Sequence, residues 1–252
     1  MKFEDWKDPN PAPVIDDVTL EDGRVIHVVR DDLIDGGSKV RFVDFMIRNL
    51  DEEEVVFGGC PATGYAQMAL PLVCKKYGKK ATLFMAKRDP SKYTEYQKKA
   101  LKFGANIQWV NMGMLTVTLS RARKYFEADK ENRFNLPLGL EHPSVVQSIA
   151  KVCRDLPFTP TEIWSVGSSG TINRGMQMGW PDIPSNVVQV GHKLTEREAG
   201  RSKIHIAEYK FDKKVKDEEM PPFPSAPTYD AKGWKFVVEH AKDGAVFWNV
   251  GA

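Results

Sequence analysis

The feature that most constrains the fold is a regular alternation of short apolar runs with longer amphipathic stretches, which begins near residue 25. Short apolar runs bounded by glycine, proline or charged residues predict buried strands, and the stretches between them have the spacing of helices. Strands separated by such helices build right-handed βαβ units, in which helices cover both faces of a parallel sheet. The sequence therefore predicts an α/β fold with three layers, helix on sheet on helix.

The expected elements follow from this alternation. Strands are expected at 25–29, 55–57, 80–86, 105–110, 161–166 and 186–190, and in the closing run GAVFWNVG. Helices are expected at 39–50, 65–78, 91–104, 114–129, 142–156 and 231–241, with one more after a glycine loop in 167–179. The charged and then proline-rich stretch 212–227 predicts an extended loop.

Composition narrows the class of protein. The 252 residues include 36 basic and 34 acidic side chains, so no strong electrostatic field favours nucleic acid or an anionic membrane, and we expect neither as a partner. The three cysteines form no CxxC pair and the five histidines have no ligand spacing, so we expect a reducing compartment and no metal site. The polar, proline-rich start is no signal peptide, and no apolar run approaches the ~20 residues of a membrane span. We expect a cytoplasmic protein.

One glycine-rich loop is the most informative motif. In WSVGSSGTINRG, the residues Gly167-Ser168-Ser169-Gly170-Thr171 stand between an expected strand and an expected helix. Three hydroxyls and free backbone N–H groups would then face one point at the positive end of a helix dipole, which suits a phosphate. The loop lacks the GK[ST] ending of nucleoside-triphosphate loops and the GxGxxG spacing of dinucleotide loops. It predicts a phosphate of another ligand, and a plain strand-to-helix turn is the structural alternative.

A second junction of the same kind occurs in FGGCPATGYAQ, residues 57–67. It offers backbone donors and Thr63 near a helix start, and would suit a carboxylate as readily as a phosphate. A simple turn is the alternative here as well.

Lys39 follows two glycines and a serine in RDDLIDGGSKVRF and opens an expected helix. Burial and the positive ends of the backbone N–H groups both disfavour an ammonium there and lower the pKa of the amine. An amine of lowered pKa is what Schiff-base chemistry needs, whereas a solvated lysine is the structural alternative. A reactive lysine together with a phosphate loop is the requirement of pyridoxal 5'-phosphate, an aldehyde with a phosphate tail.

Several motifs, in order along the chain, resemble those of the fold-type II pyridoxal-phosphate enzymes, the tryptophan synthase β-like enzymes. The resemblance is closest to the branch of 1-aminocyclopropane-1-carboxylate (ACC) deaminase and D-cysteine desulfhydrase. The segments that carry it are GGSKVR (36–41), GGCPATGYAQMA (58–69), GLEHP (139–143), GSSGT (167–171), TYDAK (228–232) and the closing VFWNVGA.

This resemblance implies mostly parallel twisted sheets in two subdomains, with the cofactor in the cleft. Lys39 would form an aldimine with the cofactor and move the α-proton of the substrate, and residues 167–171 would bind the phosphate. Tyr229 would stand near the cofactor ring as a second catalytic residue, and Asp230 near the pyridine nitrogen. The larger, cofactor-binding subdomain would comprise residues 1–50 and 150–252, and the smaller one, with the GG loop, residues 51–149. Members of this family form dimers, so we expect a homodimer.

The chain departs from the deaminases in the GG loop. The serine-asparagine pair that handles the substrate carboxylate in those enzymes is missing. Depending on the alignment, Ala62 and Thr63 or the later Tyr65 stand in its place. The expected substrate-binding residues are therefore Thr63, Gly64 and Tyr65, and deamination of ACC itself is in doubt.

Three functions are compatible with these observations. The first is a pyridoxal-phosphate lyase or deaminase that acts at the α- or β-carbon of a small amino acid. The second acts by elimination or decarboxylation on an amino-acid group attached to a larger molecule such as a modified nucleobase, for which the basic segment 191–203 is the sequence support. The third is a protein that binds the cofactor without catalysis.

Overall fold

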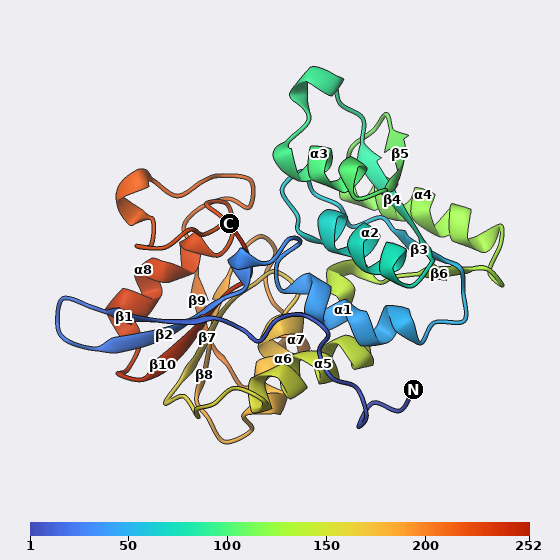
Figure 1. The fold of residues 1–252 in the computed structure, drawn as a ribbon. Helices are drawn as coiled ribbons and strands as arrows, with labels where there is room; N and C mark the ends of the chain where they lie inside the picture. The colour runs from blue at the N-terminus through green and yellow to red at the C-terminus, as the bar shows by residue number, and fades with distance from the viewer. The chain divides into compact units, whose positions relative to one another are not determined.

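The computed structural model describes all 252 residues, and they form two compact units (Figure 1). Unit 1 comprises residues 1–9 and 39–145, and unit 2 comprises residues 10–38 and 146–252. Each unit has a sheet of its own. The α/β class and the mostly parallel sheets predicted from the sequence are confirmed.

Unit 2 is built on a six-stranded sheet of order β1-β2-β10-β7-β8-β9. Only β1 is antiparallel to its neighbour. The strands are β1 (Ile15–Thr19), β2 (Val25–Arg30), β7 (Ile163–Gly167), β8 (Ser185–Gln189), β9 (Lys203–Ile206) and β10 (Ala245–Asn249). The helices are α5 (Pro143–Arg154), whose first residues belong to unit 1, α6 (Thr171–Gly179), α7 (Glu196–Ala199) and α8 (Ala231–His240).

The central strands of this sheet are buried on both faces. Trp164 and Phe247 pack with Trp234 and Val237 of α8 in one apolar cluster, and α5 and α6 lie on the other side in Figure 1. Helices α5 and α6 approach closely, because a Cβ at Gly175 would meet the Ile149 side chain at 2.4 Å. Near-continuous apolar runs are typical of parallel strands that are covered on both faces, which explains why the sequence identified them.

Unit 1 is built on a four-stranded parallel sheet of order β5-β4-β3-β6. Its strands are β3 (Glu54–Phe57), β4 (Lys80–Ala86), β5 (Asn106–Val110) and β6 (Arg133–Asn135). Its helices are α1 (Lys39–Arg48), α2 (Ala66–Lys76), α3 (Glu95–Lys102) and α4 (Leu115–Glu127). Helices α2 and α4 contact β3 and β4, and α1 and α3 pack on α2.

The first nine residues belong to unit 1 because Trp6 is fully buried there. Its indole N–H donates to the buried carboxylate of Asp44, 3.0 Å away, which also accepts from Lys76 and Tyr77. A buried carboxylate with three donors is satisfied, so this network holds the N-terminal segment against α1.

The structure contains three strands that the sequence did not predict, namely β1, β6 and β9. All three are edge strands whose residues are largely exposed or half-buried, so they lack the apolar runs that identify central strands. Helix α1 packs on α2 and therefore belongs to unit 1, whereas the sequence grouped residues 1–50 with the C-terminal part. No helix combines the length and the apolar character that crossing a membrane requires.

Candidate functional site

The predicted phosphate loop, residues 167–171, joins the end of β7 to the start of α6 in unit 2. Gly170 has φ +68°, and a Cβ there would lie 2.0 Å from the Glu198 carbonyl oxygen. Only glycine fits this position. Other residues rarely adopt a positive φ, and their Cβ atom would collide with the Glu198 carbonyl. The loop is thus held tightly against the segment that carries Glu198.

The hydroxyls of this loop lie close to one another and to Tyr229. The Ser169 and Thr171 hydroxyl oxygens are 3.3 Å apart, and the Ser168 hydroxyl lies 3.4 Å from the Tyr229 hydroxyl. The first N–H groups of α6 have no acceptor within the helix, and they carry its positive dipole end. Hydroxyls and N–H groups at one helix start fit the phosphate of a ligand.

Tyr229 and Asp230 directly precede α8, and Asp230 is fully buried. Burial raises the pKa of Tyr229 to about 12; the Ser168 hydrogen bond lowers it by less, and the Asp230 carboxylate adds to the rise. The phenol is therefore neutral at physiological pH and is able to donate a hydrogen bond. The structure brings loop 167–171 and Tyr229 together within unit 2.

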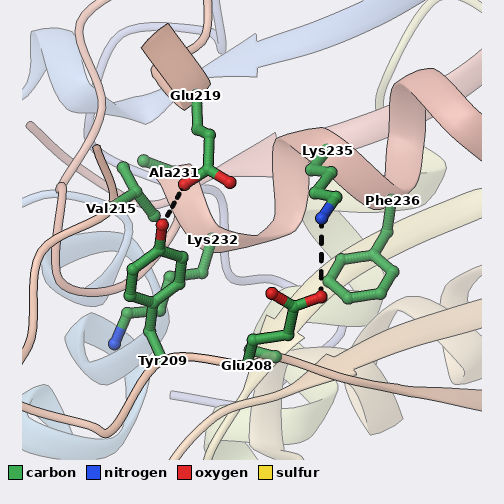
Figure 2. Close-up of a pocket in the computed structure, with 9 residues that line it drawn as sticks. Glu208, Tyr209, Val215, Glu219, Ala231, Lys232, Lys235 and Phe236 are labelled. Atoms are coloured by element: carbon green, nitrogen blue, oxygen red, sulfur yellow. Dashed lines mark hydrogen bonds and ion pairs between the residues drawn. The ribbon is translucent and has the colours of Figure 1, made fainter. Parts of the chain in front are cut away.

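A second lysine follows Tyr229 closely in the sequence, and the amine of this residue, Lys232, has a structural role. Its buried amine donates to the carbonyls of Lys210 and Phe211 at 2.8 and 3.1 Å. Figure 2 shows the adjoining pocket, which Tyr209, bonded to Glu219, helps to line. Its volume of about 10 Å³ holds one water at most. Burial lowers the pKa of Lys232, but both carbonyls engage its amine, so this lysine anchors a loop.

The residue before Lys39 is anchored in the core of unit 2. The Trp248 indole N–H donates to the Ser38 hydroxyl at 2.9 Å and to the Asp31 carboxylate at 3.0 Å, and all three residues are buried. The Ser38 N–H donates to the Val250 carbonyl at 3.0 Å. We name Asp31, Ser38 and Trp248 the indole network.

Lys39 is the first residue of α1 and is half-buried. The boundary between the two compact units falls between Ser38 and Lys39, so the lysine begins unit 1 next to an anchored residue of unit 2. Gly36 and Gly37 both have positive φ, at +88° and +65°. The two glycines therefore serve the turn that leads into the helix, which answers why they precede this lysine.

The GG loop leads from β3 to α2 in unit 1, and its shape depends on Gln67. Gln67 is fully buried, and its amide nitrogen donates to the carbonyls of Pro61, Ala62 and Gly64 at 3.0, 3.2 and 2.9 Å. These carbonyls are thereby turned toward the interior. No pattern in the sequence singles out Gln67, because glutamine on a helix is usually exposed.

The expected substrate-binding residues lie on this loop. Thr63 and Gly64 are half-buried, whereas Tyr65 is 7% exposed and packs edge-on against Tyr96 at 5.2 Å. The Thr94 hydroxyl donates to the Ala62 carbonyl at 2.7 Å. Both backbone groups of Gly64 are engaged within the loop, because its N–H donates to the Pro61 carbonyl at 3.0 Å and its carbonyl accepts from Gln67. Tyr65 serves the packing of the loop, and Thr63 contributes a half-buried hydroxyl.

The basic segment 191–203 has structural partners for two of its side chains. Arg201 donates to the carbonyls of Gln177, Trp180 and Ile183 at the end of α6, and His192 lies 3.2 Å from the Glu198 carboxylate. Arg201 therefore satisfies the end of a helix, and this weakens the segment as a candidate for contacting a large substrate.

Comparison with known proteins gives two results. No family model matches the chain. The chain is 27% identical over 248 residues to a glycyl-dTMP PLP-dependent decarboxylase of Pseudomonas phage M6, and the match covers 85% of this chain and 87% of the relative.

Solved structures resemble the whole chain. An ACC deaminase homologue superposes with a TM-score of 0.80 at 14% identity, covering 97% of this chain and 90% of its own. The processed threonine deaminase isoform 2 of Solanum lycopersicum gives 0.69 at 12% identity, with coverages of 96% and 84%. The predicted fold is confirmed: the chain has the fold of the fold-type II pyridoxal-phosphate enzymes.

The indole network can be tested by replacing Trp248 with phenylalanine. This change removes the N–H donor and leaves two buried acceptors short of a partner, which costs about 1–3 kcal/mol. Trp234→Phe is the matched control, because Trp234 is a buried indole that packs in an apolar cluster and forms no side-chain hydrogen bond. Urea unfolding should show the larger loss for Trp248→Phe, and equal losses would contradict the role of the N–H group.

The role of Gln67 predicts an asymmetry between two buried glutamines. Gln67→Glu should lower the free energy of unfolding by about 1–3 kcal/mol and speed amide exchange in residues 61–65, because an acceptor then faces three carbonyls. Gln97 instead uses its oxygen to accept from the Thr94 N–H, so Gln97→Glu should cost less. If urea unfolding shows the same loss of unfolding free energy in both variants, Gln67 does not hold the GG loop in the way described.

The raised pKa of Tyr229 predicts a loss of stability at high pH. Between the ordinary value of 10.0 and about 12 the unfolded phenol ionises while the folded one keeps its proton, so the unfolding free energy falls as pH rises. Tyr229→Phe removes this contribution. The stability difference between wild type and variant should therefore shrink across this window. A constant difference in urea titrations at successive pH values would argue against a buried phenol.

Proposed function

We propose that this protein is a pyridoxal-phosphate-dependent decarboxylase that acts on an amino-acid group carried by a nucleotide. The observation that carries the proposal is the match to the glycyl-dTMP decarboxylase, which extends over 85% of this chain and 87% of the relative. The fold, shared with deaminases and other enzymes of fold type II, supports the same cofactor.

The residues of the chain fit this cofactor. Loop 167–171 would bind the phosphate through its hydroxyls and the N–H groups of α6, and Lys39 would hold the aldehyde carbon. Tyr229, a neutral phenol beside the loop, would donate to the cofactor, and the buried Asp230 would face the pyridine nitrogen. An acidic partner there keeps the ring protonated, which strengthens its capacity to accept electrons.

The GG loop favours loss of a carboxylate over its retention. Asparagine and serine side chains that could bind a carboxylate firmly are missing from residues 60–65, and Pro61 has no N–H group to donate. Strong hydrogen bonds to a carboxylate stabilise the ground state, but carbon dioxide leaves as a neutral molecule. Such bonds would therefore raise the barrier to decarboxylation. A loop that positions the carboxylate with few donors suits this reaction.

The chemistry then requires one proton transfer from the protein. When bound, the cofactor accepts the electron pair released at the α-carbon. The bond between the α-carbon and the carboxylate breaks, and carbon dioxide leaves. The Lys39 amine, in its protonated form, delivers a proton to the α-carbon in place of the lost group, so that one proton is consumed per turnover.

The proposal is tested by supplying glycyl-dTMP to the cofactor-loaded protein and measuring carbon dioxide and the decarboxylated nucleotide by mass spectrometry. Lys39→Ala should lower the rate by at least about a hundredfold, because it removes the proton donor. Lys242→Ala, at an exposed lysine, is the control. Borohydride reduction of the wild type should attach the cofactor to the peptide that contains Lys39.

Two other outcomes would contradict the proposal. Ammonia released from free amino acids, without turnover of glycyl-dTMP, would make the protein a deaminase or lyase of small substrates. Cofactor attached to Lys39 with no turnover of either substrate class would make it a cofactor-binding protein without catalysis.

A further inference from the structure

Basic residues are concentrated in one part of the chain. Residues 75–102 contain ten lysines and arginines but only two acidic residues, although the whole chain is nearly balanced at 36 against 34. Some of these cations have structural partners: Lys76 pairs with Asp44, and Lys79 donates to two backbone carbonyls. When these partnered cations are set aside, the excess of basic over acidic residues is greatest between β4 and α3.

Three exposed cations, Lys87, Arg88 and Lys92, lie on this connection, and none forms an ion pair. We name these three the cationic connection. The intervening Asp89 is already engaged, because its carboxylate accepts from the Ser91 hydroxyl and N–H at 2.6 and 2.9 Å. These hydrogen bonds lower the pKa of Asp89, and they hold its carboxylate within the turn formed with Ser91.

The cationic connection lies at the carboxyl edge of the unit 1 sheet. The Lys87 N–H donates to the carbonyl of Val110, the last residue of β5, at 2.9 Å. In parallel α/β sheets, ligands bind outside this edge. The GG loop leaves the same edge after β3, and the Thr94 hydroxyl donates to the Ala62 carbonyl at 2.7 Å. The cationic connection and the GG loop therefore leave the same edge of the unit 1 sheet, and the bond from Thr94 to Ala62 joins the two segments.

An aromatic pair adjoins the cations. The rings of Tyr93 and Trp109 stack with centroids 4.9 Å apart and an interplanar angle of 17°, and both side chains are half-buried. Tyr93 directly follows Lys92 in the sequence. Cations interleaved with partly exposed aromatic rings are typical of surfaces that bind nucleotides and single strands, where the cations contact phosphate and the rings contact bases.

We propose that the cationic connection binds the phosphate of the substrate, with the Tyr93–Trp109 pair beside the nucleoside. This inference rests on the proposed function and specifies its substrate class: an amino-acid group next to a phosphate, rather than a free amino acid. A free nucleotide and a strand of nucleic acid would both supply this phosphate.

The test compares ligands that differ only in phosphate. The cofactor-loaded protein is titrated by calorimetry with thymidine, dTMP and oligothymidylate at two salt concentrations. We expect dTMP to bind at least tenfold more tightly than thymidine. The triple variant Lys87→Ala, Arg88→Ala, Lys92→Ala should lose this preference and show a smaller dependence of affinity on salt. Lys213→Ala, Lys214→Ala, Lys216→Ala is the control, because it removes three exposed charges elsewhere.

The results also identify the source of the phosphate. Equal affinity for dTMP and oligothymidylate supports a free nucleotide, and much tighter binding of the oligonucleotide with a steeper salt dependence supports a strand. The proposal is overturned if thymidine and dTMP bind equally, or if the control variant loses as much affinity as the test variant.

Failure of the proposed decarboxylation can be recognised separately. The protein could fail to turn over glycyl-dTMP and still prefer dTMP to thymidine, with this preference lost in the triple variant. That result would support the phosphate site and contradict the proposed decarboxylation.

Discussion

The interaction on which the candidate site most depends is the buried hydrogen bonding of Trp248 with Asp31 and Ser38. One indole N–H serves two acceptors that lie 217 and 210 residues away in the sequence. Because buried polar groups in folded proteins are nearly always hydrogen-bonded, this pairing favours the observed arrangement of the segment. It links Ser38, the residue before Lys39, to β10, which is the last strand in the sequence and lies inside the unit 2 sheet. The lysine thus begins its helix from an anchored backbone.

The backbones of the two glycine-rich junctions are held in shape by different contacts. Loop 167–171 turns at the positive φ of Gly170 and is pressed against backbone atoms of Glu198. The GG loop is instead shaped from inside by Gln67, whose amide engages three carbonyls. In both loops contacts within the protein fix the path of the backbone, through Glu198 in one and through the Gln67 amide nitrogen in the other.

Much of the fold was predictable because central parallel strands leave a simple signal. Strands β4, β7 and β10 are apolar runs that are buried along most of their length. The edge strands β1, β6 and β9 were missed because partners on one side only leave a mixed polar pattern. Among basic residues, segment 191–203 drew attention in the sequence, yet Arg201 satisfies the end of α6. The cations at 87–92, which have no such partners, were overlooked.

The sequence by itself determined the α/β class, the two strand-glycine-helix junctions and the lysine that follows Gly36 and Gly37. These features depend on local rules: apolar periodicity, the conformational freedom of glycine and the N–H groups at a helix start. Only the tertiary structure decided that Ser38 is held by Trp248, that Gln67 shapes the GG loop and that Lys232 anchors a loop instead of reacting. Each of these roles depends on which partners burial brings within about 3 Å, and residues far apart in the chain carry no local sign of that proximity.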